Sequence, residues 1–227
     1  MPVDYHHGVR VIEISGGIRP IRTISTAVIG LVATASDADA AAFPLNTPVL
    51  VTSVLDALGK AGTLGTLSRV LNAIGDQGNA LCVIVRVADG EGADAAAKEA
   101  DQNSKVIGTV TVTGQRTGMQ ALLSAQAQLA IKPRILACPG LDTLAVATEL
   151  AAIAQKLRAF AYVSAWAAET KEEAVLYRDN FGQREVMVLW PDFLTWDTVT
   201  SASADAWATA RAIGLRAKLD EQIGWPK

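Results

Sequence analysis

The sequence predicts an α/β protein with a mixed, largely parallel sheet, helices on both faces of that sheet, and an extended N-terminal arm. Short runs rich in β-branched residues, such as Leu81–Val87, alternate with segments whose apolar residues recur at helical spacing, such as Asp142–Leu157. Strands separated by helices of this length are typical of parallel βαβ units. The arm is predicted from Gly8–Ala35, where a strand with a solvent-exposed face, a break that contains Gly and Pro, and a buried strand follow one another.

Two strands of different character make up Gly8–Ala35. Ile24–Thr34 is almost wholly apolar, which is typical of a strand buried on both faces. The earlier strand carries charges that suit an edge position, and Gly and Pro between the two allow a sharp change of direction. We therefore expect a detachable arm strand formed by Val9, Arg10, Val11, Ile12, Glu13 and Ile14, with a hinge at Gly16, Gly17 and Pro20.

The middle of the chain predicts two further strands and one clear helix. Pro48–Thr52 is a short strand after a Pro-rich loop, and Leu81–Val87 is a buried strand. Between them, apolar residues at helical spacing predict a helix that begins with Thr63 as N-cap and stops at Gly75. The following stretch is less regular, and we expect a short helix at 94–100 and a strand at 107–113.

The second half repeats the alternation more regularly. Asp142 is expected to cap a helix whose Val146, Leu150, Ile153 and Leu157 form one apolar stripe. The other elements expected here are a helix through Met119, Leu122 and Leu129, strands at 134–138, 160–163 and 185–190, a helix opened by a capping box at Thr170–Glu173, and a long helix at 201–223.

Composition excludes several classes of function. The chain has 227 residues and a formal net charge of −3, without a basic footprint for nucleic acid or a polybasic stretch for a membrane surface. No apolar run reaches the roughly 20 residues needed to cross a bilayer, and the N-terminus lacks a secretion signal. Cys82 and Cys138 lie in apolar runs, which favours reduced, packed thiols in a cytoplasm.

Candidate sites at the ends of the predicted strands are weak. The loop Asp89–Asp94 contains Gly-x-Gly but surrounds it with carboxylates, which would repel a pyrophosphate. Cys138–Asp142 is explained by a turn and a helix cap, and Cys138 lacks a nearby histidine as base. His6 and His7 are adjacent, so on a strand they point to opposite faces and are poorly placed as metal ligands.

One cluster of acids and aromatics allows two interpretations. Asp192 and Asp197, flanked by Trp190 and Trp196, are conceivable as a carboxylate pair for sugar hydrolysis. The run of Trp190, Phe193 and Trp196 is more typical of packing or of a protein interface. We predict no catalytic, cofactor-binding or metal-binding residue and no cofactor. An α/β ligand-binding module or a nucleotide- or sugar-processing enzyme domain remains the alternative.

The chain resembles the tail sheath proteins of contractile-tailed bacteriophages, in the branch shared by P2-like phages and R-type pyocins. The resemblance runs through essentially the whole chain. It is carried by Tyr5–Val9, Arg19–Ile21, Ser25–Val32, Lys132–Leu136, Pro139–Thr143, Gln155–Val163, Trp190–Phe193 and Gly214–Lys218.

The resemblance implies a structural, non-enzymatic subunit that polymerises around an inner tube and contracts to drive the tube through a cell envelope. It also implies that residues 1–20 are a linking arm, whose strand joins a small sheet of neighbouring subunits, and that residues 21–227 are the sheath core domain. The implied partners are neighbouring sheath subunits and the tail tube protein, with the baseplate and tail terminator as further contacts. The implied location is the virion tail, or a phage-tail-like particle, assembled in the cytoplasm of the bacterial host.

One departure from the family accompanies this resemblance. Family members continue beyond the final Gly224–Lys227 with a C-terminal domain that contacts the tube. We therefore expect a truncated chain that is mainly monomeric or weakly associated, because its arm strand would lack the sheet it completes.

Overall fold

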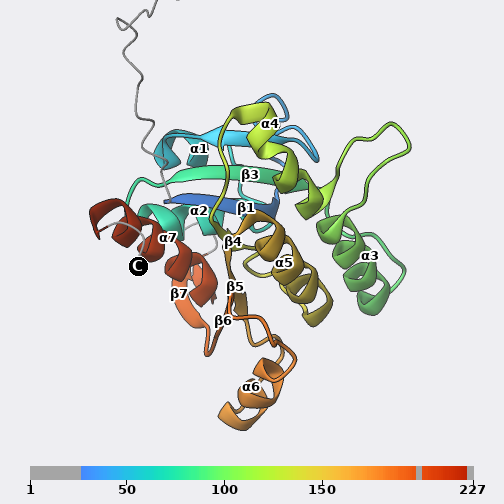
Figure 1. Cartoon of the computed structure of the whole chain (residues 1–227). Coiled ribbons are helices and arrows are strands. Elements are labelled where there is room, and N and C mark those ends of the chain that lie inside the picture. Colours follow the sequence, from blue (N-terminus) through green and yellow to red (C-terminus); the bar gives the residue numbers. More distant parts are fainter. Residues whose placement is uncertain (1–26, 198–200, 224–227) are drawn as a thin grey trace, which may run out of the picture.

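Residues 27–197 and 201–223 are described by the computed structural model, in which a six-stranded sheet lies between two layers of helices (Figure 1). The strand order is β2-β3-β1-β4-β5-β6, and only β2 runs antiparallel to its neighbour. The predicted mixed, largely parallel sheet is confirmed. The strands are β1 (Val28–Thr34), β2 (Pro48–Val51), β3 (Leu81–Val87), β4 (Ile135–Ala137), β5 (Phe160–Ser164) and β6 (Val186–Leu189).

Helices cover both faces of the sheet, as predicted (Figure 1). One face carries α1 (Val54–Leu58), α2 (Leu67–Gly75) and α7 (Ala208–Ile223). The other face carries α3 (Ala95–Ile107), the 3₁₀ helix η1 (Gly118–Ser124), α4 (Ala125–Leu129) and α5 (Leu144–Leu157). The remaining helix, α6 (Lys171–Arg178), has no buried residue and lies beyond β6.

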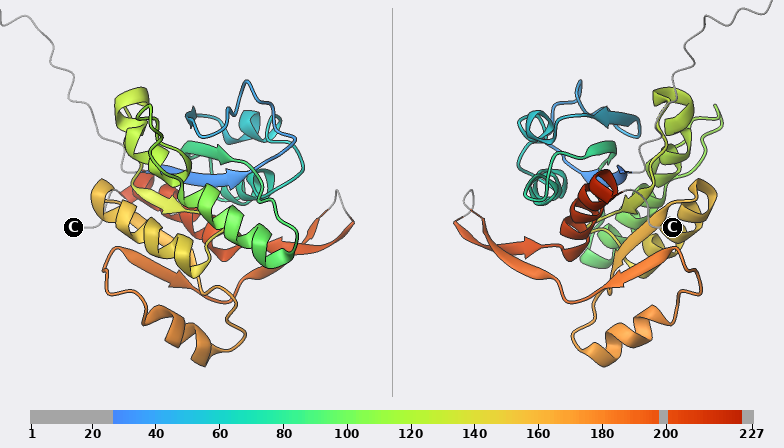
Figure 2. Two further views of the ribbon diagram at one scale, coloured as in Figure 1. Left: turned by 90° about the vertical axis from the view of Figure 1, so that its right-hand side faces the viewer. Right: turned by 60° about the vertical axis from the view of Figure 1, so that its left-hand side comes forward.

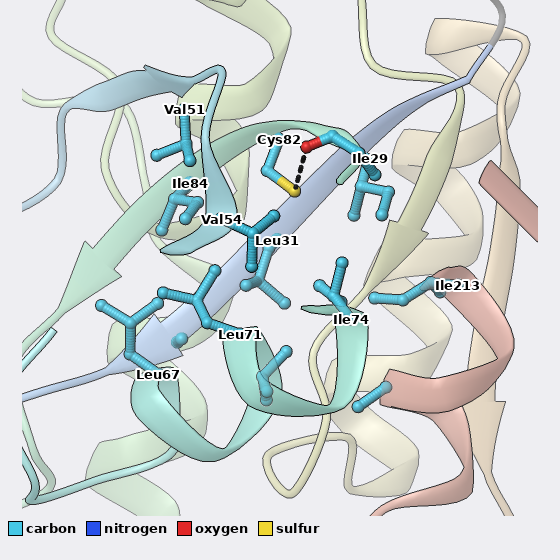
Figure 3. Packing of buried hydrophobic residues seen from close by; sticks show 14 of the residues in the cluster. Ile29, Leu31, Val51, Val54, Leu67, Leu71, Ile74, Cys82, Ile84 and Ile213 are labelled. Carbon is cyan, nitrogen blue, oxygen red and sulfur yellow. Dashed lines mark hydrogen bonds between the residues drawn. The ribbon is translucent and has the colours of Figure 1, made fainter. Parts of the chain in front are cut away.

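Strand β1 is the centre of the core, because all seven of its residues are buried. Ile29 and Leu31 point toward α2 and α7, where they pack with Leu71, Ile74 and Ile213 (Figure 3). Val28 and Val32 of β1 belong to the apolar cluster on the opposite face. A strand in contact with a helical layer on each side needs apolar residues at every position, which is the pattern that the sequence displays.

Gly30 in β1 is required by close packing. An ideal Cβ at this position would lie 2.6 Å from the Cδ2 of Leu136 and 2.9 Å from the Cβ of Pro133. A side chain here would therefore force β1 and the segment before β4 apart.

The helix predicted from Thr63 begins later, with Thr66 as its N-cap, although it ends at Gly75 as predicted. The amide and the hydroxyl of Thr63 both donate to Oδ2 of Asp37, at 2.8 and 3.0 Å. The amide of Leu64 donates to Oδ1 of the same carboxylate. Asp37, which follows β1, thus holds this loop outside the helix, and sequence spacing alone does not reveal such a long-range contact.

The irregular region after β3 differs from the expectation in two ways. Asp94 caps α3 by accepting from the amide of Ala97 at 2.7 Å, and the helix runs to Ile107 rather than stopping at residue 100. The strand predicted at 107–113 is wrong, because Gly108 ends the helix with φ +69° and a tight turn follows. In that turn the Thr111 amide donates to the carbonyl of Gln115. The alternating Val and Thr residues therefore form a local loop and not a strand of the sheet.

The long helix predicted at 201–223 is also wrong in its first part. Ala202–Ala206 forms strand β8, which pairs antiparallel with β7 (Phe193–Asp197), and the helix α7 starts only at Ala208. Ala and Ser are compatible with both a helix and a strand, and pairing with β7 stabilises the strand. Figure 2 shows β7 and β8 projecting as a ribbon from the body of the molecule.

The capping box that the sequence predicts for α6 is present. The hydroxyl of Thr170 accepts from the amide of Glu173, and the Glu173 carboxylate accepts from the Thr170 amide at 3.2 Å. Although α6 has no fully buried residue, its Tyr177 packs against the core beside Phe181, with ring centroids 5.6 Å apart, and this contact and the cap hold the helix in place. The predicted stripe of α5 is confirmed as well, since Val146, Leu150, Ile153 and Leu157 are all buried.

Candidate functional site

The predicted arm strand, Val9–Ile14, and its hinge at Gly16, Gly17 and Pro20 lie outside the described residues. His6 and His7 lie outside them too. The arm therefore stays a prediction from the sequence.

In the described part of the chain, an α/β enzyme would bind its ligand at the carboxyl ends of the parallel strands, between β1 and β4 where the strand order reverses. The loop after β3 lies at this edge. Its amides already have partners, because Gly90 N donates to Oε1 of Gln102 at 2.7 Å and Glu91 N donates to Oδ2 of Asp101 at 2.8 Å. These amides are not available to cradle a phosphate, which agrees with the weak Gly-x-Gly signal.

The loop after β4 is closed by packing. Gly140 has φ +73°, and an ideal Cβ on it would lie 2.5 Å from the indole ring of Trp207. Trp207, which directly precedes α7, thus covers the turn at the topological switch point. The backbone there is shielded by an aromatic ring rather than open to a ligand.

Asp142 does not cap α5, contrary to the sequence prediction, because Thr143 occupies the N-cap position. The Asp142 side chain is fully buried, and its Oδ2 accepts from the amide of Ser164 at 2.6 Å. Burial raises the pKa of Asp142 to about 6, and the nearby Asp192 carboxylate adds to this effect while the Ser164 bond opposes it. The residue joins the ends of β4 and β5 and is a structural element.

Replacing Asp142 with Asn should stabilise the protein increasingly as the pH rises from 4 to 7. The folded-state pKa of about 6 lies above the ordinary value of 3.8, so the folded chain holds a proton that the unfolded chain releases. Stability from this carboxyl is therefore present at low pH and is lost as pH rises through that window, by at most about 3 kcal/mol. Asn keeps an acceptor for Ser164 and carries no charge.

Urea unfolding of the native protein and of Asp142→Asn at pH 4 and pH 7 measures this difference. The advantage of Asp142→Asn should be larger at pH 7 than at pH 4. Asp142→Ala is the control, because it removes the acceptor and should be less stable at both pH values. An equal difference between native protein and Asp142→Asn at both pH values would contradict the account.

The two cysteines are buried free thiols. Burial raises the pKa of Cys82 to about 12 and raises that of Cys138 as well, so both thiols stay protonated. A thiol in this state is a poor nucleophile. Among the described residues, no group of three or more His, Cys, Asp and Glu is placed to hold a metal ion, and no helix is long and apolar enough to cross a membrane.

The aromatic run lies on the surface rather than in the core. Phe193 and Trp196, on the ribbon, are 53% and 65% exposed, whereas Trp190 precedes the ribbon, is 40% exposed and donates its indole N–H to the carbonyl of Ala168 at 2.9 Å. Leu194, on the same ribbon, is 74% exposed. Large apolar side chains gathered on a projecting ribbon are typical of an interface.

The sugar-hydrolysis interpretation has little support from the ribbon. Oδ1 of Asp192 accepts from the amide of Ala208 at 2.8 Å, so this carboxylate holds the start of α7. The side chain of Asp197 lies outside the described part.

A cleft of about 370 Å³ lies between α2 and the ribbon. Its lining includes Arg69, Asp76, Trp196, Trp207 and Arg211. Arg211 donates to Asp76 across the cleft at 3.1 Å, linking α7 to the end of α2. The lining combines charged side chains with two tryptophans, a composition that suits contact with another chain.

Two family models match the chain. The model described as "Phage tail sheath protein central domain" matches residues 114–227, and the model described as "Tail sheath protein Gp18 domain III N-terminal region" matches residues 26–87. The chain belongs to the phage tail sheath family. The resemblance found in the sequence is thereby confirmed.

Curated relatives of this sheath chain come from phages and a prophage. It is 57% identical over 224 residues to the tail sheath protein of Escherichia phage P2, covering 99% of this chain and 57% of that protein. It is 44% identical to the major tail sheath protein of Serratia phage KSP20, covering 100% of this chain and 57% of that protein. A putative prophage major tail sheath protein of Pseudomonas aeruginosa is 36% identical, with coverages of 98% and 56%. The chain thus spans a little over half the length of these relatives.

Solved structures support the fold of the sheath chain. The anti-feeding prophage baseplate in its contracted state gives a TM-score of 0.62, covering 96% of this chain and 55% of that chain. The sheath complex of an extracellular contractile injection system, PVC, also contracted, gives a TM-score of 0.57, covering 99% and 53%. The identity is 16% in both cases, so these matches show the fold alone.

Proposed function

We propose that the protein is a structural subunit of a contractile tail sheath, which polymerises around an inner tube and contracts to drive the tube through a target cell envelope. The observation that carries this proposal is the 57% identity to the phage P2 tail sheath protein across 99% of the chain. At that identity the two chains share a fold, so the same assembly role is the simplest account.

The described part of the chain supports a non-enzymatic role. The amides at the carboxyl edge of the sheet are bonded, Trp207 closes the turn after β4, and the two thiols are buried. These features favour a structural role over the nucleotide or sugar enzyme. The exposed aromatic ribbon and the open cleft fit a protein that works by contact with other chains.

The proposed partners are other copies of the sheath subunit and the tail tube protein, with the baseplate and tail terminator at the two ends. The proposed location is the virion tail or a phage-tail-like particle, with assembly in the cytoplasm of the bacterial host. Within this scheme residues 1–20 form the linking arm and residues 21–227 the sheath core. Val9–Ile14 would add a strand to a neighbour's sheet through main-chain hydrogen bonds, with alternate side chains fixing the register.

A chimeric sheath tests the proposed function. In this chimera the present chain replaces the matching segment of the phage P2 tail sheath protein. The chimera should restore plaque formation to a phage P2 strain that lacks its own sheath protein. Failure to form plaques, with the chimera folded and expressed at the level of the native sheath protein, would contradict the proposal.

A further inference from the structure

Four basic residues gather at the amino end of the parallel sheet, and we call them the basic edge: Lys132, Arg134, Lys156 and Arg158. They come from the segment before β4 and from the end of α5, which meet because the guanidinium of Arg134 donates to the carbonyl oxygens of Leu157 and Arg158 at 3.1 and 2.9 Å. Partial burial lowers the pKa of Lys132, and the positive charges of Arg134 and Arg158 lower it further. Repulsion of this kind marks a concentration of positive charge.

Three carboxylates gather at the opposite end of the sheet, and we call them the acidic loop: Asp89, Glu91 and Asp94. All three residues are exposed, and the Glu91 side chain is 89% exposed. Lys105 lies 3.9 Å from Glu91 but only 2.8 Å from Asp101, so its charge is held mainly by Asp101. The acidic loop therefore presents net negative charge to solvent.

The topology of the sheet puts these two groups at opposite ends of the molecule. Ile29 of β1 is in register with Cys82 of β3 and with Ile135 of β4, and all three strands run in the same direction. The acidic loop follows the end of β3, whereas the basic edge precedes β4. A strand the length of β1 spans roughly 20 Å, so the two groups are too far apart to pair within one subunit.

Helix ends account for only part of this charge separation. A cation beside the last carbonyls of α5 and an acid at the N-cap of α3 are each stabilised by the helix dipole, which explains Arg134 and Asp94. Lys132 and Asp89 lie outside both helices. Lys132 forms no ion pair within the described part of the chain, and Lys105, which donates to the Asp89 carbonyl at 2.8 Å, is paired mainly with Asp101. Helix capping therefore does not explain the charges of Lys132 and Asp89.

We propose that the basic edge of one copy docks against the acidic loop of a second copy. The inference rests on the proposed function, since it describes how sheath subunits contact one another. Complementary patches at opposite ends of a subunit form a head-to-tail contact, which builds rings or open helices rather than closed pairs. Rings and helices are the assemblies that a sheath requires, and charge complementarity fixes the order of the copies.

Two opposite charge reversals test this contact. In variant A, Lys132→Glu, Lys156→Glu and Arg158→Asp make the basic edge acidic, while Arg134 is kept because it bonds two carbonyl oxygens. Asp is chosen at position 158 because that residue has φ +50°. In variant B, Asp89→Lys and Glu91→Lys make the acidic loop basic. Each variant alone presents like charges at both ends, whereas a mixture restores opposite charges at every contact. We expect the mixture of A and B to associate at least tenfold more tightly than either alone in sedimentation velocity at low salt, and to dissociate at high salt.

A matched control separates this contact from simple attraction between oppositely charged proteins. For this comparison variant A and the control both also carry Asp89→Asn and Glu91→Gln, so that neither can dock an acidic loop on the basic edge of variant B. The control adds Lys171→Glu, Arg178→Glu and Arg184→Glu, which change the net charge as the reversals of variant A do but leave the basic edge intact. This control should not associate with variant B. Equal association of variant B with variant A and with the control, or no association of A with B, would overturn the inference. Such a result would leave the plaque test of the proposed function unaffected, so the two failures are distinguishable.

Discussion

Deleting Met1–Ser15 from the chimeric P2 sheath should abolish plaque formation and leave tails without a cohesive sheath. The arm strand, Val9–Ile14, is expected to pair with a neighbour's sheet through main-chain hydrogen bonds, and removing it leaves an unpaired edge and no strand that links the subunits. The measurement is the plaque titre together with negative-stain electron microscopy of the particles.

Deleting only Met1–Asp4, which precedes the arm strand, is the matched control and should leave the titre close to that of the intact chimera. A single substitution, Val11→Pro, should reproduce the loss, because proline removes a backbone donor from the strand. Sheaths of normal number and length after deletion of Met1–Ser15 would contradict the role given to the arm.

Replacing Leu31 with Ala should lower the free energy of unfolding by about 2–5 kcal/mol. Leu31 is fully buried at the middle of β1 and packs against the α2 layer, so its loss leaves a cavity at the centre of the core (Figure 3). Because neighbouring strands and helices all contact β1, the cavity has little room to collapse.

Chemical unfolding of the purified protein checks this value. Leu55→Ala is the matched control, because it removes the same atoms from a side chain that is 77% exposed, and it should change stability by less than about 0.5 kcal/mol. A loss at Leu31 no larger than the loss at Leu55 would mean that β1 is not the centre of the core.

Local patterns in the sequence were sufficient for much of the fold. The apolar run of β1, the stripe of α5 and the capping box at Thr170 each depend on residues close together in the chain, and each is present in the structure. The prediction was wrong where a hydrogen bond to a residue far away in the sequence determines the local structure. Asp37 accepts from Thr63 and holds it outside α2. The carboxylate of Asp142, which was predicted to cap a helix, accepts instead from the amide of Ser164.

The ribbon shows the same limit at a larger scale. Ala202–Ala206 has the composition of a helix, and only its pairing with β7 makes it a strand. Trp196 was assigned either to packing or to an interface, and its 65% exposure favours the interface. The charge separation could not be predicted either, because only the sheet topology places Lys132 and Asp89 at opposite ends. The arm rests on the sequence alone.

Electron microscopy of tails that carry the chimeric P2 sheath tests the central claim most directly. If this chain is a building block of a contractile sheath, the tails should show a striated sheath that becomes shorter and wider on contraction and exposes the inner tube. Bare tubes, or sheaths that assemble but do not shorten, in particles where the chimera is folded and abundant would contradict it.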